Sequence, residues 1–143
     1  MTMLTLVQAR IIADTALDLA RRKSFKPLSV AVLDARGARK VVLTEDSTSL
    51  KRAEVAFAKA YGALSMGSGS RTLMTMANER PHFIAAAMHV ADGQLVPVPG
   101  GVLIRAGSEV VGAVGISGDT SDNDEAAAIA GIEAAGFTAD PGA

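Results

Sequence analysis

The chain has 143 residues, 49% apolar and 20% charged, which suits one compact domain over residues 1–143 and excludes a disordered chain. It has no cysteine and only 3% aromatic residues, which excludes disulfides, thiolate metal sites and thiol nucleophiles and leaves no stacking platform for nucleic acid. The net charge of −1 hides an asymmetry, because residues 1–60 carry eleven of the 14 basic side chains and residues 61–143 carry nine of the 15 acidic ones. This asymmetry favours self-association over binding to a polyanion.

The first 44 residues are typical of a helix followed by a hairpin. Apolar residues recur every three to five positions over 5–23, and basic side chains cluster where this helix ends. Polar residues interrupt the apolar run, so it is neither a membrane span nor a signal-peptide core, and we expect a cytoplasmic protein. Pro27 ends the helix, and strands are expected at 28–37 and 40–44.

A long helix is expected over 50–66, and it is apolar on nearly all sides. Only Arg52 and Lys59 interrupt one face, so this helix needs a cover on both sides. A sheet supplies one cover, and a helix or a neighbouring subunit supplies the other. A short helix then follows from Ser70, its expected cap, through Asn78.

The remaining chain predicts short, adjacent strands and a last helix. Strands are expected at 94–98, 100–105 and 109–117, with connections too short for parallel crossovers. A helix over 124–137 ends at Gly136, where a left-handed residue is expected. The predicted fold class is therefore α+β, with a roughly five-stranded antiparallel sheet and the helices packed on one face.

An acidic cluster precedes the last helix, in GDTSDNDE at 118–125. Its carboxylates do not alternate as a calcium loop requires, and the helix begins at once. Asp122 as the N-cap, with Glu125 three residues later, fits a capping box. We therefore expect these side chains to serve the helix, and no metal site is predicted.

The chain has two histidines, and a histidine on an irregular loop is more often a plain polar contact than a ligand. His82 and His89 would share one face of a helix, but Pro81 and Gly93 bracket this stretch and favour an irregular loop. With no cysteine available, His82, Tyr61 and the methionines are the candidate axial ligands if the chain binds haem.

Several segments together resemble the GlcG/HbpS-like family. They are KAY at 59–61, RPHFIAAA at 80–87, PVPGGVLI at 97–104 and the glycine-rich GAVGISGDTSDNDEAAAIAGIEAAGF at 112–137. The resemblance implies a profilin-like α+β fold and oligomers of several subunits. Relatives include haem-binding proteins and companions of small-acid metabolism. Arg36 stands where family members have glycine, and Leu103 where they have proline.

Two hypotheses of function follow. The first is a homo-oligomeric module that binds haem or a similar small molecule between the long helix and the PGGVLI strand. The cationic amine of Lys59 and the backbone N–H groups of the Gly100–Gly101 turn would suit a carboxylate of the ligand. The expected ligand-binding residues are Lys59, Tyr61, His82, Gly100 and Gly101.

The alternative is a small enzyme without an organic cofactor, of lyase or isomerase type, that acts on a small carboxylic acid, aromatic or not. In that case Lys59 or Arg71 would hold the carboxylate, and His82 or Glu125 would move a proton. A haem titration separates the two hypotheses.

Overall fold

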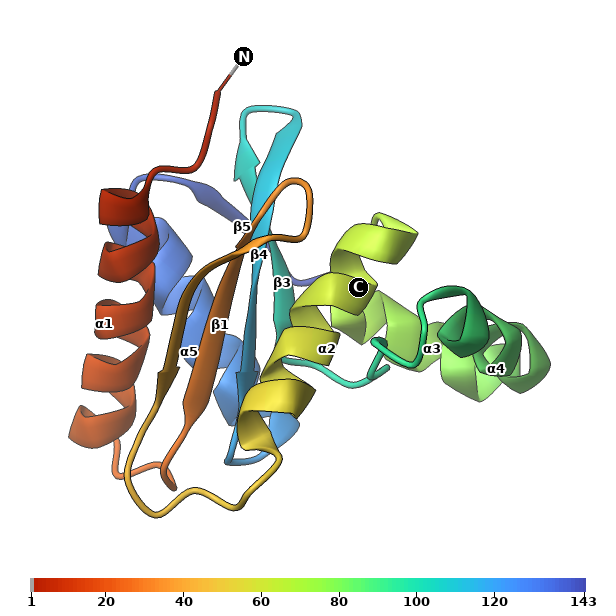
Figure 1. Cartoon of the computed structure of the whole chain (residues 1–143), viewed down its shortest axis with the longest axis horizontal. Helices are drawn as coiled ribbons and strands as arrows, with labels where there is room; N and C mark the ends of the chain where they lie inside the picture. The colour runs from red at the N-terminus through yellow and green to blue at the C-terminus, as the bar shows by residue number, and fades with distance from the viewer. Residues whose placement is uncertain (1) are drawn as a thin grey trace.

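A five-stranded antiparallel sheet forms the centre of the protein, seen here in a computed structural model that describes residues 2–143 (Figure 1). The strand order is β2-β1-β4-β3-β5. The strands are β1 (Ser29–Asp34), β2 (Arg39–Thr44), β3 (Gly101–Ala106), β4 (Glu109–Ser117) and β5 (Thr138–Asp140). The helices are α1 (Leu6–Arg22), α2 (Arg52–Met66), α3 (Ser70–Glu79), α4 (Pro81–Val90) and α5 (Ser121–Ala134). The predicted α+β class with an antiparallel sheet is confirmed.

The helices cover both faces of the sheet, α1 and α5 on one side and α2 on the other (Figure 1). In β1, Val30 and Val32 enter the core beneath α1 and α5, whereas Ala31 and Leu33 pack against α2. The expectation that the helices pack on one face is therefore wrong. Successive residues of the central strands are buried in turn on opposite faces, as in a sheet that is covered twice.

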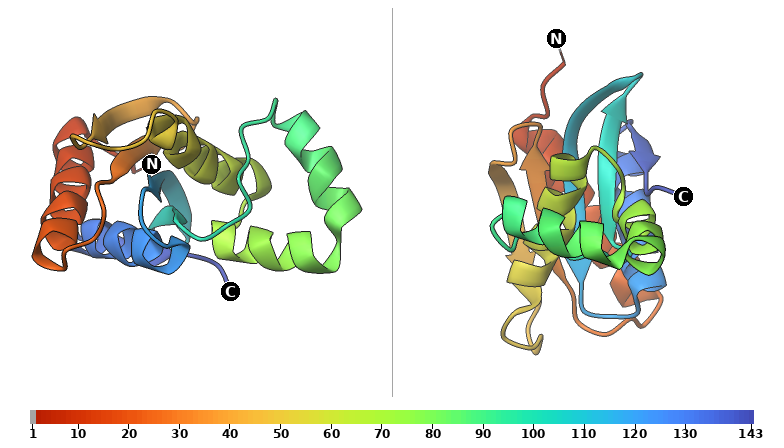
Figure 2. Two further views of the ribbon diagram at one scale, coloured as in Figure 1. Left: turned by 90° about the horizontal axis from the view of Figure 1, so that it is seen from below. Right: turned by 90° about the vertical axis from the view of Figure 1, so that its right-hand side faces the viewer.

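Helices α3 and α4, with the returning segment 91–100, form an arm that projects from the body (Figure 2). In the described part of the chain, α4 packs against α3 and against no other helix or strand. A small apolar cluster of its own holds the arm together, and it includes Leu73, Ile84 and Leu95. The arm is attached to the body through α3 and through Leu95 of the returning segment, which packs against Gly62 of α2.

Two expectations for this region are wrong. The stretch expected as an irregular loop is helix α4, because Pro81 occupies its first turn, where a proline costs no hydrogen bond. The stretch expected as a strand at 94–98 belongs to no strand, and its two neighbouring prolines, Pro97 and Pro99, cannot donate to a ladder. The fifth strand is instead β5, near the end of the chain. The left-handed residue expected at Gly136 is confirmed, with φ +86°.

Helix α2 lies directly on the backbone of the sheet. A side chain at Gly115 of β4 would place its Cβ 1.8 Å from the carbonyl oxygen of Ala56, and one at Gly101 of β3 would lie 2.2 Å from that of Lys59. Both contacts are with backbone atoms, which cannot rotate away as a side chain can. These two glycines therefore set how closely the helix approaches the strands. None of the helices within residues 2–143 is long and apolar enough to cross a membrane.

We predict that Gly115→Ala lowers the free energy of unfolding by about 3 kcal/mol or more, because the new methyl group forces α2 away from β4. Gly136→Ala is the matched control, since its positive φ is strained but no atom lies within 4 Å of the added Cβ. The control should lose only about 1 kcal/mol. Urea denaturation measures both, and equal losses would contradict the close packing of α2 on β4.

Candidate functional site

Lys59 of α2 is buried, with only 3% of its surface exposed, and it pairs with a carboxylate from the opposite side of the sheet. Its Nζ donates to Oδ2 of Asp124 on α5 at 3.1 Å and to the carbonyl oxygen of Ile116 on β4 at 2.9 Å. At Gly100, φ is +120° and a Cβ would lie 2.8 Å from this Nζ. Only glycine readily adopts this positive φ and also leaves room for the ammonium. Gly100 is therefore required where the turn before β3 packs against the Lys59 side chain.

Burial dominates the electrostatics of this pair. Desolvation lowers the pKa of Lys59 and raises the pKa of Asp124, although their attraction and hydrogen bond oppose both shifts. The other oxygen of Asp124, Oδ1, accepts from the backbone N–H of Asp119 at 3.0 Å. Both carboxylate oxygens are therefore engaged within the protein.

The five expected ligand-binding residues do not all meet within one chain. Lys59, Gly100 and Gly101 are in contact with one another. The ring of Tyr61 instead adjoins Gly37 in the β1–β2 turn, and His82 lies exposed on α4. A ligand role for Lys59 stays a hypothesis, and it would require the pair with Asp124 to open.

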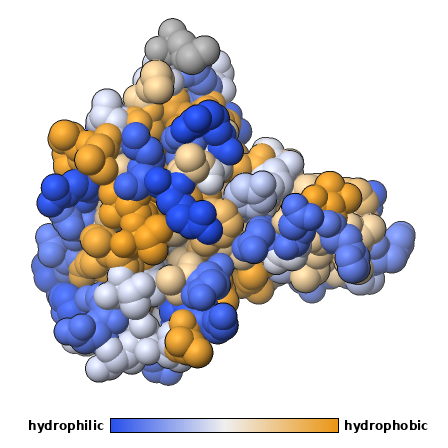
Figure 3. Space-filling model, in the orientation of Figure 1, coloured by the Kyte–Doolittle hydropathy of each residue, from blue (hydrophilic) through white to orange (hydrophobic). Residues whose placement is uncertain are grey.

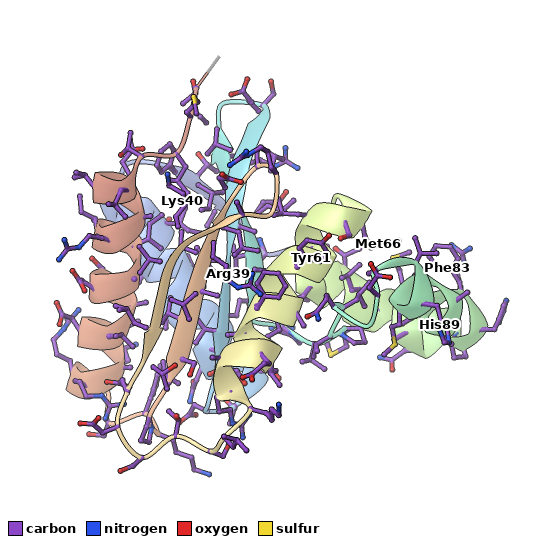
Figure 4. The ribbon with its side chains drawn as sticks, in the orientation of Figure 1. Arg39, Lys40, Tyr61, Met66, Phe83 and His89 are labelled. Atoms are coloured by element: carbon purple, nitrogen blue, oxygen red, sulfur yellow. The ribbon has the colours of Figure 1, made fainter. Side chains whose placement is uncertain are left out.

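The aromatic side chains of α2 form a small stack. The rings of Phe57 and Tyr61 lie 5.2 Å apart between their centroids, nearly parallel. The guanidinium of Arg39 lies 4.0 Å above the ring of Phe57. Figure 4 shows Tyr61 and Arg39 close to each other on the body, while Phe83 and His89 lie apart from them on the arm. Tyr61 and the histidines thus belong to different surfaces of one chain.

The acidic segment before α5 uses its carboxylates differently from what its sequence suggested. Thr120, and not Asp122, is the N-cap of α5, because its Oγ1 accepts from the backbone N–H of Asn123. Asp122 and Glu125 instead pair with Arg71 of α3, whose Nε lies 3.0 Å from Glu125 Oε2. These pairs attach the arm to the body.

A second correction concerns Ser70. It is the first residue of α3 and not its cap, since the N-cap position belongs to Gly69. Its Oγ accepts from the backbone N–H of Gly101 at 2.7 Å. The PGG turn therefore offers one of its backbone donors to this serine and not to the solvent.

Helix α4 places both histidines on one exposed face, because they are two helical turns apart. His89 borders a surface pocket of about 350 Å³ that is otherwise lined by Ala85, Met88 and Gly93. His82 does not line this pocket. Because a loop was expected here, the shared helical face of the two histidines was not predicted. Their seven-residue spacing was the sequence feature that indicated it.

Comparison with known proteins places the chain in a family. The model of the family described as haem degrading protein HbpS-like matches residues 4–133, so this chain belongs to the HbpS-like family. It is similar to the crystal structure of HbpS, with 28% identity, a TM-score of 0.80 and 93% of this chain and 90% of that chain covered. A search of curated proteins finds none that matches.

Two further solved structures share the fold at lower identity. The PduOC:heme complex has a TM-score of 0.86 with 23% identity, and the alignment covers 95% of this chain and 97% of that one. The Klebsiella pneumoniae protein ORFY has the same TM-score with 20% identity, and 95% and 93% are covered. At these identities the likeness shows the fold alone.

We predict that Lys59→Met destabilises the protein by about 3–5 kcal/mol, because it leaves Asp124 charged, buried and without its partner. The double variant Lys59→Met/Asp124→Asn should lose less, since the amide oxygen can still accept from Asp119 and no charge is buried. Lys51→Met is the matched control, because its pair with Glu54 is exposed and is worth less than about 1 kcal/mol. Chemical denaturation of all three variants tests this, and a double variant less stable than Lys59→Met would contradict it.

Proposed function

We propose that this protein binds haem, with His89 of α4 as the ligand of the iron. The observation that carries the proposal is an exposed imidazole beside a pocket with apolar walls, in a chain of the HbpS-like haem-degrading family. The HbpS-like fold also occurs in PduOC, which has been solved with heme bound. Imidazole is the ligand by which many proteins hold haem iron.

The two histidines of α4 are suitable donors for haem iron. The histidines are about 10 Å apart along the helix axis, so one iron can bind only one of them from the same chain. His89 is preferred because the pocket beside it offers Ala85 and Met88 to an apolar ligand. His82 is the alternative, and it lies close along the helix to Arg80, a cation of the kind that pairs with a propionate.

Bound haem would supply a redox-active iron. The chain's own part is to donate one imidazole nitrogen and to present apolar surface from α4. A single chain leaves the exposed side of α4 open to solvent, so full shielding of a haem requires a further cover.

We propose that a homo-oligomer supplies this cover. On the arm, Val90 is 86% exposed and Met88 is 37% exposed, and α4 touches only α3 among the helices and strands of residues 2–143. Figure 3 shows apolar side chains at the surface of this projecting arm. Such a surface is typical of a subunit contact.

We predict a stoichiometric Soret shift when haem is titrated into the protein. His89→Ala should weaken haem binding about tenfold or more, because the imidazole that would hold the iron is lost, whereas His82→Ala should leave the affinity unchanged. Absorption spectroscopy gives both affinities.

The reverse pattern would assign the iron to His82 and contradict the placement at His89. Unchanged binding in both variants would remove the ligand from α4. A wild-type protein without any Soret shift would contradict the haem function itself.

We predict a homo-oligomer larger than a dimer, so light scattering should give a mass above twice the chain mass of 14.6 kDa. Val90→Asp should reduce this mass by placing a charge in the contact between arms. Leu50→Asp is the matched control, because Leu50 is 88% exposed but lies outside the arm. A wild-type mass of one chain at micromolar concentration would contradict the proposal.

A further inference from the structure

A cavity of about 350 Å³ lies at one end of the sheet, on a different part of the molecule from the arm. The segments around it are residues 2–4, the β1–β2 turn at 34–36 and the start of β4 at 109–111, together with Lys40. It shares no residue with the pocket beside His89. Its ligand would therefore be bound independently of haem.

The first unusual feature of this cavity is an irregularity in β2. Val41 pairs in register with Val32 of β1, and the next pair toward the turn is Arg39 with Leu33. Lys40 lies between these two pairs and has no partner of its own. This is a β-bulge, which turns a side chain away from the regular alternation, and Lys40 lines the cavity.

A second bulge lies across the cavity. Gly112 of β4 pairs with Ile104 of β3, and the next pair is Val110 with Arg105. Val111 is the extra residue, and it also lines the cavity. Two bulges on strands at either side of β1 thus meet at one cavity, and bulges are frequent next to binding sites.

Among the charged side chains of residues 2–143 that line the cavity, one cation has no partner. Asp34 accepts from the backbone N–H of Arg36 at 2.9 Å and from its guanidinium at 3.0 Å. Glu109 accepts from the backbone N–H of Thr2 at 3.1 Å. The side chain of Lys40 has no hydrogen-bond or ion-pair partner among residues 2–143. The charge of Asp34 is therefore balanced by Arg36, whereas Glu109 accepts a single hydrogen bond from a neutral amide and keeps its negative charge at the rim. The ammonium of Lys40 is not engaged by either carboxylate.

The remaining wall is apolar. Leu4 and Val111 are buried there, and Met3 is 75% exposed at the rim. We propose that this cavity binds a small organic acid, whose carboxylate pairs with Lys40 and whose apolar body lies against Met3, Leu4 and Val111. A cation next to an apolar wall selects a ligand that carries both features, because neither feature alone satisfies the site.

The test uses benzoate as the probe and records amide chemical shifts of the full chain by NMR. We expect saturable shifts at 2–4, 34–40 and 109–111. Benzamide keeps the ring without the charge and acetate keeps the charge without the ring, so both should bind about tenfold more weakly or worse. Benzoate shifts that are absent, or that map elsewhere, would overturn the proposal.

Variants test the contact with Lys40. Lys40→Gln should weaken benzoate about tenfold, and Lys23→Gln, which changes an exposed lysine outside the cavity, should not change it. Met3→Asp places an anion at the exposed rim and should also weaken benzoate without disturbing the fold. Unchanged benzoate affinity in either Lys40→Gln or Met3→Asp would overturn the proposal.

A failure here is distinguishable from a failure of the haem proposal. Lys40→Gln should bind haem like the wild type, and His89→Ala should bind benzoate like the wild type. A loss of haem binding in Lys40→Gln, or of benzoate binding in His89→Ala, would contradict two separate sites.

Discussion

The buried pair between Lys59 and Asp124 connects the parts of this fold. It joins α2 on one face of the sheet to α5 on the other, and the same ammonium binds a carbonyl oxygen of β4. A buried ion pair contributes little net stability, because desolvation offsets much of the attraction, but an unpaired charge in the same place is costly. The pair therefore mainly fixes the relative position of α2 and α5. If the two helices shifted, a buried charge would lose its partner or become exposed. Gly100 is constrained in turn, since a side chain there would displace the ammonium.

The segment that supplies Asp124 also holds the arm. Asp122 and Glu125 flank it in sequence and pair with Arg71 at the start of α3. These pairs are partly exposed, and such pairs are individually weak. The arm's own apolar cluster is small and is set apart from the two clusters that flank the sheet. The proposed oligomer would add contacts from another copy to those that hold the arm within one chain.

The sequence predicted most of the body of the protein because its elements are regular. The limits of α1, α2 and β4 follow from apolar periodicity and from turns, and the resemblance drawn from the glycine-rich segments identified the family. Coverage of both faces of the sheet was not predicted, although the continuous apolar runs of its central strands are typical of a sheet that is covered twice. Helix α3 of the arm was predicted, but α4 was missed. A proline such as Pro81 breaks a helix in its interior but is favoured in its first turn, and the local sequence did not distinguish the two cases.

The candidate site was less predictable than the fold, for a reason visible in Lys59. The position of Lys59 on an apolar helix correctly indicated that its charge needs a partner. Its location next to the Gly100–Gly101 turn was also expected. The sequence could not show that the partner is Asp124, because that contact joins residues 65 positions apart across the sheet. A lysine that binds a ligand and a lysine that pairs with a carboxylate of the same chain produce the same sequence pattern on their helix.

The cavity at Lys40 and the pocket at His89 use different parts of the fold, and β4 is the element through which they connect. Its first residues line the cavity, and near its last residues Ile116 accepts from Lys59, whose partner segment anchors the arm. Between these ends β4 is buried and paired on both sides, with β1 and with β3. Coupling between sites requires an element with two discrete arrangements, and a strand that is paired and covered so fully has little room for a second one. The architecture therefore favours additive binding of the two proposed ligands within one chain.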